Sequence, residues 1–194
     1  MKLPLQYQIS EFDCGPSSLR NAMAYLFDRD QLPQEILTSI FNLSLDGYHA
    51  HGTKKSVNIY GTSDDAMMSF SKQFNEISAR DHLPYRSKVL LDSAVDTRNP
   101  DFSGPLKNGG AIVAKVMLDV AHYVLITGYD QGKVRLFDPY MPETPYVYPG
   151  VKWTMNHPYW YNVETDEEYL NRVDTEWWSF GEVPERIALT FTKK

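Results

Sequence analysis

The chain has 194 residues, 42% of them hydrophobic, so it is long enough to bury one core and too short for two full-sized domains. Its net charge of −6 and the absence of a block of basic residues disfavour nucleic acid as the main partner. No run of about 18 apolar residues and no signal-peptide core are present, so no membrane span is expected. The single cysteine, Cys14, suits a reducing compartment, and we expect a soluble, cytoplasmic, single-domain protein.

The first predicted helix runs from Gly15 to Phe27 and carries one apolar stripe. Asp13 is a favoured N-cap residue, and Pro16 is tolerated in the first turn because the backbone donors there lack partners within the helix. Cys14 is therefore expected at the N-terminal end of this helix. The stripe consists of Leu19, Ala22, Met23, Leu26 and Phe27.

Two more helices are predicted before residue 80. One begins at Pro33, and the other follows a cap at Ser63 and an acidic first turn. The Met67-Met68 pair is expected in the core. The residues predicted to face inward are Ile36, Leu37, Ile40 and Phe41 in the first and Met67, Phe70 and Phe74 in the second.

A surface loop is predicted between Ser44 and Thr62, because glycines and polar residues interrupt every regular pattern there. Its two histidines, His49 and His51, invite a metal-site interpretation. Side chains two positions apart do not share a helix face, and no third ligand lies nearby in the sequence. We therefore expect solvated loop histidines and no bound metal or other cofactor.

The second half of the chain is predicted to be rich in strands. From Ile77 to Lys107 no period is clear apart from a short strand at Val89 to Leu91, and the aromatic residues after Pro139 are expected to pack irregularly. We predict an α+β fold with a helical half at about 1–80 and a β half at about 81–194. The clearest strands are 111–118, 121–129, 133–138 and 186–192, with a short helix near 166–172.

The hairpin formed by strands 121–129 and 133–138 decides whether His122 and Asp138 can meet. If Asp130 to Gly132 form a three-residue loop with a bulge, paired residues sum to 262, and His122 and Asp138 become diagonal neighbours on one face. A two-residue loop would move Asp138 to the other face. We expect the face that also carries Val124 and Ile126 to pack against the first helix.

These positions support nucleophilic catalysis by a thiol. The helix dipole and an adjacent imidazole favour the Cys14 thiolate, while Asp138 would orient His122 as base and later as acid. The side-chain amide of Gln8, six residues before Cys14, could join the Cys14 backbone N–H in stabilising an oxyanion. Gly15 would let a substrate backbone come close.

Three motifs of the sequence carry a family resemblance. The segments QISEFDCGPSSL, AHYVLITGYD and KVRLFDPY resemble the papain-like cysteine peptidases of family thirty-nine, the bacteriocin-leader-processing peptidases and their free-standing relatives. The resemblance implies Cys14 as nucleophile, His122 as base, Asp138 as third member and Gln8 as oxyanion residue, acting on a peptide or amide bond. It also implies an N-terminal helical lobe packed on an antiparallel β lobe with the cleft between them. Leader peptidases of this family usually precede a membrane transporter, so we expect a free-standing member.

Other functions of the same residues stay open. An acyltransferase would pass the acyl group from Cys14 to an amine, and a deamidase would release ammonia from an amide. A binding module could keep the fold without chemistry, since a lone cysteine is more often a small buried hydrophobic residue than a nucleophile. The rate of Cys14 alkylation separates the last possibility from the first two.

Overall fold

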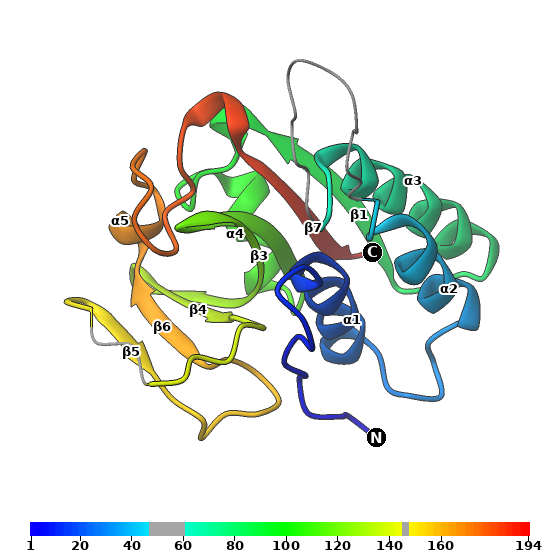
Figure 1. The fold of residues 1–194 in the computed structure, drawn as a ribbon. Helices are drawn as coiled ribbons and strands as arrows, with labels where there is room; N and C mark the ends of the chain where they lie inside the picture. The colour runs from blue at the N-terminus through cyan, green and yellow to red at the C-terminus, as the bar shows by residue number, and fades with distance from the viewer. Residues whose placement is uncertain (47–60, 145–147) are drawn as a thin grey trace, which may run out of the picture.

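The structure is a computed structural model that describes residues 1–46, 61–144 and 148–194 (Figure 1). His49 and His51 lie outside the described residues. The described chain combines helices with an antiparallel sheet, which confirms the predicted α+β class. The helices are α1 (Cys14–Leu26), α2 (Gln34–Leu43), α3 (Asp64–Arg80), α4 (Pro100–Lys107) and α5 (Glu167–Leu170).

In the described residues, seven strands form one sheet in the order β1-β7-β2-β3-β4-β6-β5, and all neighbouring strands are antiparallel. The C-terminal strand, β7, lies between β1 and β2. It therefore pairs with two strands that precede it by many residues in the sequence. The strands are β1 (Tyr85–Leu91), β2 (Ala111–Leu118), β3 (Val120–Asp130), β4 (Lys133–Phe137), β5 (Val151–Trp153), β6 (Val163–Asp166) and β7 (Ile187–Lys193).

The three N-terminal helices follow the sequence prediction closely, and the whole apolar stripe of α1 is buried. The Ser63 hydroxyl caps α3 by accepting a hydrogen bond from the Ala66 N–H at 3.0 Å. Two predictions are wrong. Phe41 is 59% exposed because it lies one position, or about 100° around the helix, from the buried Ile40. Met68 is 36% exposed for the same reason beside the buried Met67.

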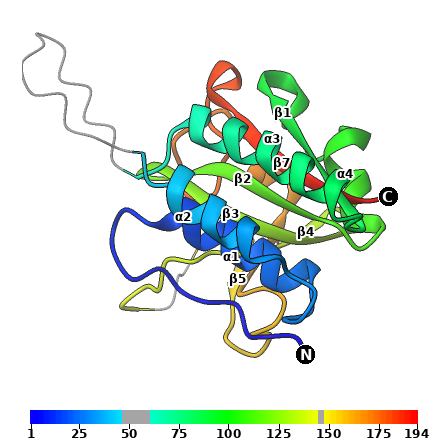
Figure 2. The same cartoon turned by 90° about the vertical axis from the view of Figure 1, so that its right-hand side faces the viewer.

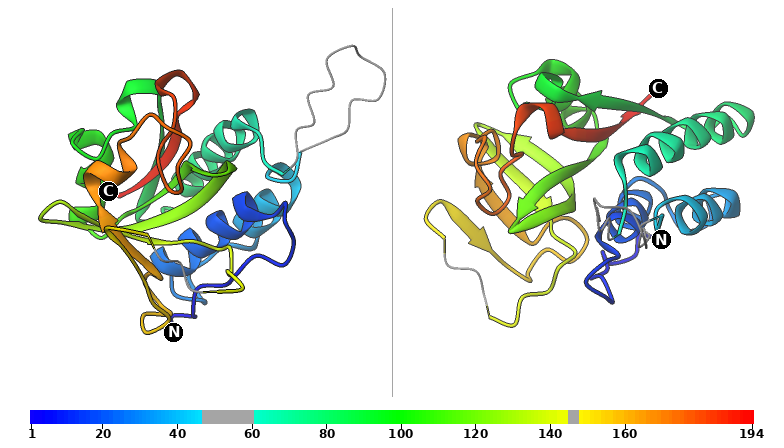
Figure 3. Two further views of the ribbon diagram at one scale, coloured as in Figure 1. Left: turned by 60° about the vertical axis from the view of Figure 1, so that its left-hand side comes forward. Right: turned by 45° about the horizontal axis from the view of Figure 1, so that its top comes forward.

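Two apolar cores lie on opposite faces of the sheet. One core joins α1, α2 and α3 to residues such as Tyr123, Leu125 and Phe191. The other places α4, α5 and the segment after α5 against the opposite face, which carries Val124 and Ile126. Figure 2 shows α2 and α3 side by side in front of the sheet, and Figure 3 shows the orange-to-red C-terminal segment on the other side.

The face of the hairpin that α1 covers differs from the prediction. Helix α1 packs on the side of β3 that carries Tyr123 and Leu125, and the Ser18 hydroxyl donates to the Tyr123 carbonyl at 2.8 Å. Val124 and Ile126 instead fill the second core. The expectation was wrong because both faces of β3 are apolar over this stretch, so alternation alone did not distinguish them.

The loop between β3 and β4 also differs from the prediction, although the predicted register survives. Asp130 pairs with Lys133 across a two-residue turn in which Gln131 and Gly132 both have positive φ. A bulge between Ile126 and Gly128 then shifts the register by one residue, so Ile126 pairs with Leu136. The bulge replaces the three-residue loop as the source of the extra residue, which keeps the parity that lets His122 and Asp138 meet.

Several elements were not foreseen. Helix α4 contains Gly104 and Pro105, which are weak helix formers, so its pattern gave no clear period. Its start did carry a signal, because Asn99 caps the helix by accepting from the Asp101 N–H at 3.0 Å and Pro100 occupies the first turn. Strands β5 and β6 have 3 and 4 residues, too few to show an alternation.

Deletion of Thr127, the residue at the bulge, tests this register. Removing it should leave a regular hairpin in which Gly128 still pairs with Arg135 and Ile126 still pairs with Leu136. His122 and Asp138 then remain diagonal neighbours on one face, so Cys14 should be alkylated at close to the native rate. A fall to the rate of a free thiol in the deletion variant would contradict the register argument. Iodoacetamide labelling followed by intact-mass measurement reads out both proteins.

Candidate active site

The loop that leads into α1 is organised by the carboxylate of Asp13. Asp13 was predicted to cap the helix, but its side chain makes no hydrogen bond to the first-turn amides. It accepts instead from the N–H groups of Ile9 and Ser10, at 3.1 and 2.7 Å, and from the hydroxyls of Ser10 and Ser17. The carboxylate therefore folds the segment from Gln8 to Cys14 back against the start of the helix.

Gly15 lets another part of the protein, rather than a substrate, approach the start of α1. A Cβ atom built on Gly15 would collide with the Thr62 side chain, whose hydroxyl donates to the Ser44 carbonyl. Thr62 precedes α3, so the absence of a side chain at Gly15 brings the α3 entrance against the Cys14 end of α1. This contact corrects the expectation that Gly15 serves the substrate.

His122 and Asp138 form a buried pair at the end of the hairpin. His122 Nε2 lies 2.8 Å from Asp138 Oδ1, and the two residues are 4% and 0% exposed. Asn162 holds the Asp138 backbone from both sides, with its side-chain oxygen accepting from the Asp138 N–H at 2.7 Å and its amide donating to the Asp138 carbonyl at 2.8 Å. The Tyr140 N–H donates to the same carboxylate oxygen at 2.8 Å. Engagement of Nε2 leaves Nδ1 of the imidazole for Cys14.

The thiol of Cys14 lies against His122 near the start of β3. The pairing of β3 with β4 ends at Leu125, so the β4 side of the strand is open at His122. Burial raises the pKa of the Cys14 thiol, but a hydrogen bond and charge from His122 and backbone N–H groups outweigh it, so the net pKa is lowered. Burial lowers the pKa of His122, while the charge and hydrogen bond of Asp138 raise it to about 10 overall. The two shifts favour a thiolate–imidazolium pair at neutral pH.

A groove of about 670 Å³ opens beside Cys14. Phe12 and Glu11 contribute from the loop before α1, and Asp64 and Asp65 from the start of α3. Asp64 accepts hydrogen bonds from Lys115 Nζ and from the Tyr123 hydroxyl, so the far wall of the groove is fixed by a polar network. His122 and Asp138 do not line this groove, and Cys14 is the member of the group that faces it.

Gln8 lies near this group through its backbone. Its N–H donates to the carbonyl of Pro139, the residue after Asp138, at 2.8 Å. Its side-chain amide nitrogen donates to the Ser10 carbonyl at 2.7 Å, and its side-chain oxygen is buried with no hydrogen-bond partner among the described residues. The second amide hydrogen stays available to a bound oxygen, and within the described structure no hydrogen bond joins this side chain to Cys14.

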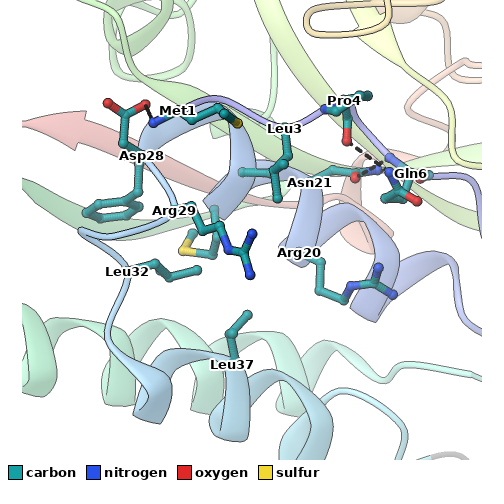
Figure 4. A pocket seen from close by; sticks show the side chains of 13 residues that line it. Met1, Leu3, Pro4, Gln6, Arg20, Asn21, Asp28, Arg29, Leu32 and Leu37 are labelled. Carbon is teal, nitrogen blue, oxygen red and sulfur yellow. Dashed lines mark hydrogen bonds and ion pairs between the residues drawn. The ribbon is translucent and has the colours of Figure 1, made fainter.

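A second cavity, of about 380 Å³, lies between the N-terminal segment, α1 and α2 (Figure 4). Leu3, Leu32 and Leu37 contribute apolar side chains to its walls. In Figure 4, Arg20 and Arg29 lie between Leu3 and Leu37. None of Cys14, His122 and Asp138 lines it. Its place beside the C-terminal half of α1 separates it from the thiol at the other end of that helix.

Neither a metal-binding group nor a membrane-spanning helix is found in the described part of the chain. No group of three or more histidine, cysteine or carboxylate residues there could hold a metal ion. No described helix has the length and hydropathy needed to cross a bilayer.

The paired pKa shifts predict an unusual pH dependence of Cys14 alkylation. As pH falls through the lowered pKa of Cys14 the thiolate is protonated, and as pH rises through about 10 His122 loses its charge, so the rate should be nearly flat between these limits. In His122→Ala the rate at neutral pH should instead rise about tenfold per pH unit, as for a free thiol. Iodoacetamide rates across this range test the prediction, and equal profiles for both proteins would contradict it.

Asp13→Asn should loosen the entrance to α1, because an amide NH2 would face donors that now meet a carboxylate oxygen. We expect a loss of at least ~2 kcal/mol in the free energy of unfolding near neutral pH. Burial raises the pKa of Asp13, but its hydrogen bonds lower it overall, so its contribution is present above the ordinary value of 3.8 and lost as pH falls through the folded value. Urea unfolding of both proteins should show the gap closing in acid, and a gap independent of pH would contradict this role.

Comparisons with known proteins bear on the fold and the family of the chain. No curated protein matches the chain. A crystal structure of a candidate C39-like peptidase from Bacillus anthracis is 14% identical, with 98% of this chain and 94% of that chain covered and a TM-score of 0.58. The peptidase domain of Streptococcus ComA, a bi-functional ABC transporter involved in a quorum-sensing pathway, is 15% identical, with 98% of both chains covered and a TM-score of 0.48.

At these identities the first structure is evidence of the shared fold alone. The family itself is established by a sequence model that matches residues 1–167. The matched range contains Gln8, Cys14, His122 and Asp138, and it ends before the last strand of the sheet. The chain is therefore a member of the Peptidase_C39 like family.

Proposed function

We propose that this protein is a cysteine peptidase that cleaves a peptide or amide bond through a Cys14 thioacyl-enzyme. The observation that carries the proposal is the contact of the Cys14 thiol with His122, whose other ring nitrogen lies 2.8 Å from Asp138. A thiol, an imidazole and a carboxylate in this order form the arrangement that activates a nucleophile in acyl transfer. Membership of a peptidase family supports a peptide as the substrate class.

The reaction begins with the thiolate of Cys14 attacking the substrate carbonyl carbon. A C–S bond forms, and the carbonyl oxygen becomes an oxyanion, which the Cys14 N–H at the helix start and the Gln8 side-chain amide would stabilise. The His122 imidazolium then gives its proton to the leaving nitrogen as the C–N bond breaks. Water, deprotonated by His122, then attacks the thioester. The C–S bond breaks, the acid leaves and the Cys14 thiolate and His122 imidazolium are restored.

The burial of each residue suits its role. Asp138 has no exposed surface, so water does not compete for the hydrogen bond that orients His122. Cys14 is 9% exposed and borders the groove, which admits a substrate to the thiol alone. Cys14 is also part of the apolar core beneath α1, so it packs against buried side chains as well as bordering the groove.

Burst kinetics with p-nitrophenyl acetate test the acyl-enzyme. The protein should release one equivalent of nitrophenolate in a burst and gain the mass of one acetyl group, and Cys14→Ala should do neither. Loss of the sulfur atom from the core should cost only about 1 kcal/mol of unfolding free energy, so this variant stays folded as a control. A burst that persists in Cys14→Ala, or none in the native protein, would refute the proposal.

Partitioning of the acetyl-enzyme separates hydrolysis from transfer. In increasing glycinamide, a peptidase should continue to release acetate alongside acetylglycinamide. Transfer to glycinamide with no measurable acetate would show an acyltransferase in place of the proposed peptidase.

Gln8→Ala should slow the burst about 10²-fold or more if the Gln8 amide stabilises the oxyanion. The melting temperature of the variant is the control for folding.

A further inference from the structure

The C-terminal segment of the chain reaches the carboxylate of Asp138. The indole Nε1–H of Trp178 donates to Asp138 Oδ2 at 2.8 Å, while His122 and the Tyr140 N–H occupy Oδ1. In the described part of the chain no other donor meets Oδ2. Both Trp178 and Asp138 are fully buried, so this hydrogen bond joins a charged acceptor to its donor away from water.

Trp178 is held rigidly in this place. Its backbone N–H donates to the Met117 carbonyl at 2.7 Å, and the Met117 backbone N–H donates to the Ser179 carbonyl at 2.8 Å. Met117 pairs with Ala121 in β3, the residue before His122, so the same end of the sheet fixes both side-chain partners of Asp138. The tryptophan has a φ of 62°, a conformation that bulky residues rarely adopt and that persists only where the surroundings impose it.

We propose that Trp178 is a positioning residue that holds the Asp138 carboxylate, and through it His122, in the orientation that Cys14 requires. The inference rests on the proposed function, because it assigns Trp178 to the same site. The family match ends at residue 167, so it assigns no role to this tryptophan. The segment after α5 is thereby part of the catalytic apparatus as well as a cover for the sheet (Figure 3).

Trp178 can orient His122 because the two oxygens of the Asp138 carboxylate meet different donors. With Oδ2 fixed by the indole, the plane of the carboxylate is set, and Oδ1 presents a defined direction to His122 Nε2. Without that donor, Oδ2 is a charged, buried oxygen with no hydrogen-bond partner, which costs free energy. The carboxylate would lower this free energy by rotating, so that its two oxygens share the donors that now meet Oδ1. Such a rotation turns the imidazole away from the thiol and weakens the thiolate–imidazolium pair.

Two substitutions at Trp178 remove the N–H. Trp178→Phe also removes volume, whereas replacement by β-(3-benzothienyl)alanine puts a sulfur in the place of the indole N–H and keeps the shape. The matched control is Trp153→Phe, because Trp153 Nε1 is buried without a hydrogen-bond partner in the described structure. The readouts are the Cys14 thiolate absorbance near 240 nm as a function of pH, the iodoacetamide rate, and the melting temperature.

We expect the benzothienyl variant to melt near the native temperature, to titrate Cys14 at higher pH, and to alkylate roughly 10-fold more slowly at neutral pH, as for one lost hydrogen bond to a charged group. Trp153→Phe should leave the titration unchanged. If native Cys14 titrates low and both Trp178 variants match it, the inference is overturned while the proposed function stands. If native Cys14 titrates as a free thiol, the proposed function fails and the inference fails with it.

Discussion

The burial of one carboxylate, that of Asp138, is the constraint on which the candidate site depends. A charge with no exposed surface must be satisfied by the protein, and here a histidine, a tryptophan and a backbone N–H supply its donors. These groups come from β3, from the segment after α5 and from the turn after β4. Meeting this one requirement therefore ties the hairpin, the C-terminal segment and, through His122, the start of α1 into a single arrangement.

Much of this could be predicted from the sequence because the relevant signals are local. The stripe of α1 placed Cys14 at a helix start, and the strand pattern around His122 and Asp138 gave a hairpin. The resemblance to the family then pointed to the same residues. The bulge at Thr127 was not visible, because a two-residue turn with a bulge and a three-residue turn give the same final register.

What the sequence did not reveal depends on contacts between distant segments. Trp178 follows Asp138 by 40 residues in a segment without periodicity, and no local pattern predicts that its indole reaches the carboxylate. Asn162 and Thr62 act in the same way, each holding part of the site from another element. The role of Asp13 was predicted wrongly from the sequence. Aspartate is a favoured helix cap, but this carboxylate accepts hydrogen bonds from the backbone of the preceding loop instead.

The proposed chemistry requires that Cys14 and His122 exist as a thiolate–imidazolium pair in the folded protein. The most direct measurement is the ¹⁵N NMR spectrum of the His122 imidazole near neutral pH, before and after alkylation of Cys14. Both ring nitrogens should carry protons in the native protein, because Asp138 and Cys14 raise the pKa of His122 despite its burial, and alkylation should lower this pKa. A neutral His122 in the native protein, unchanged by alkylation, would contradict it.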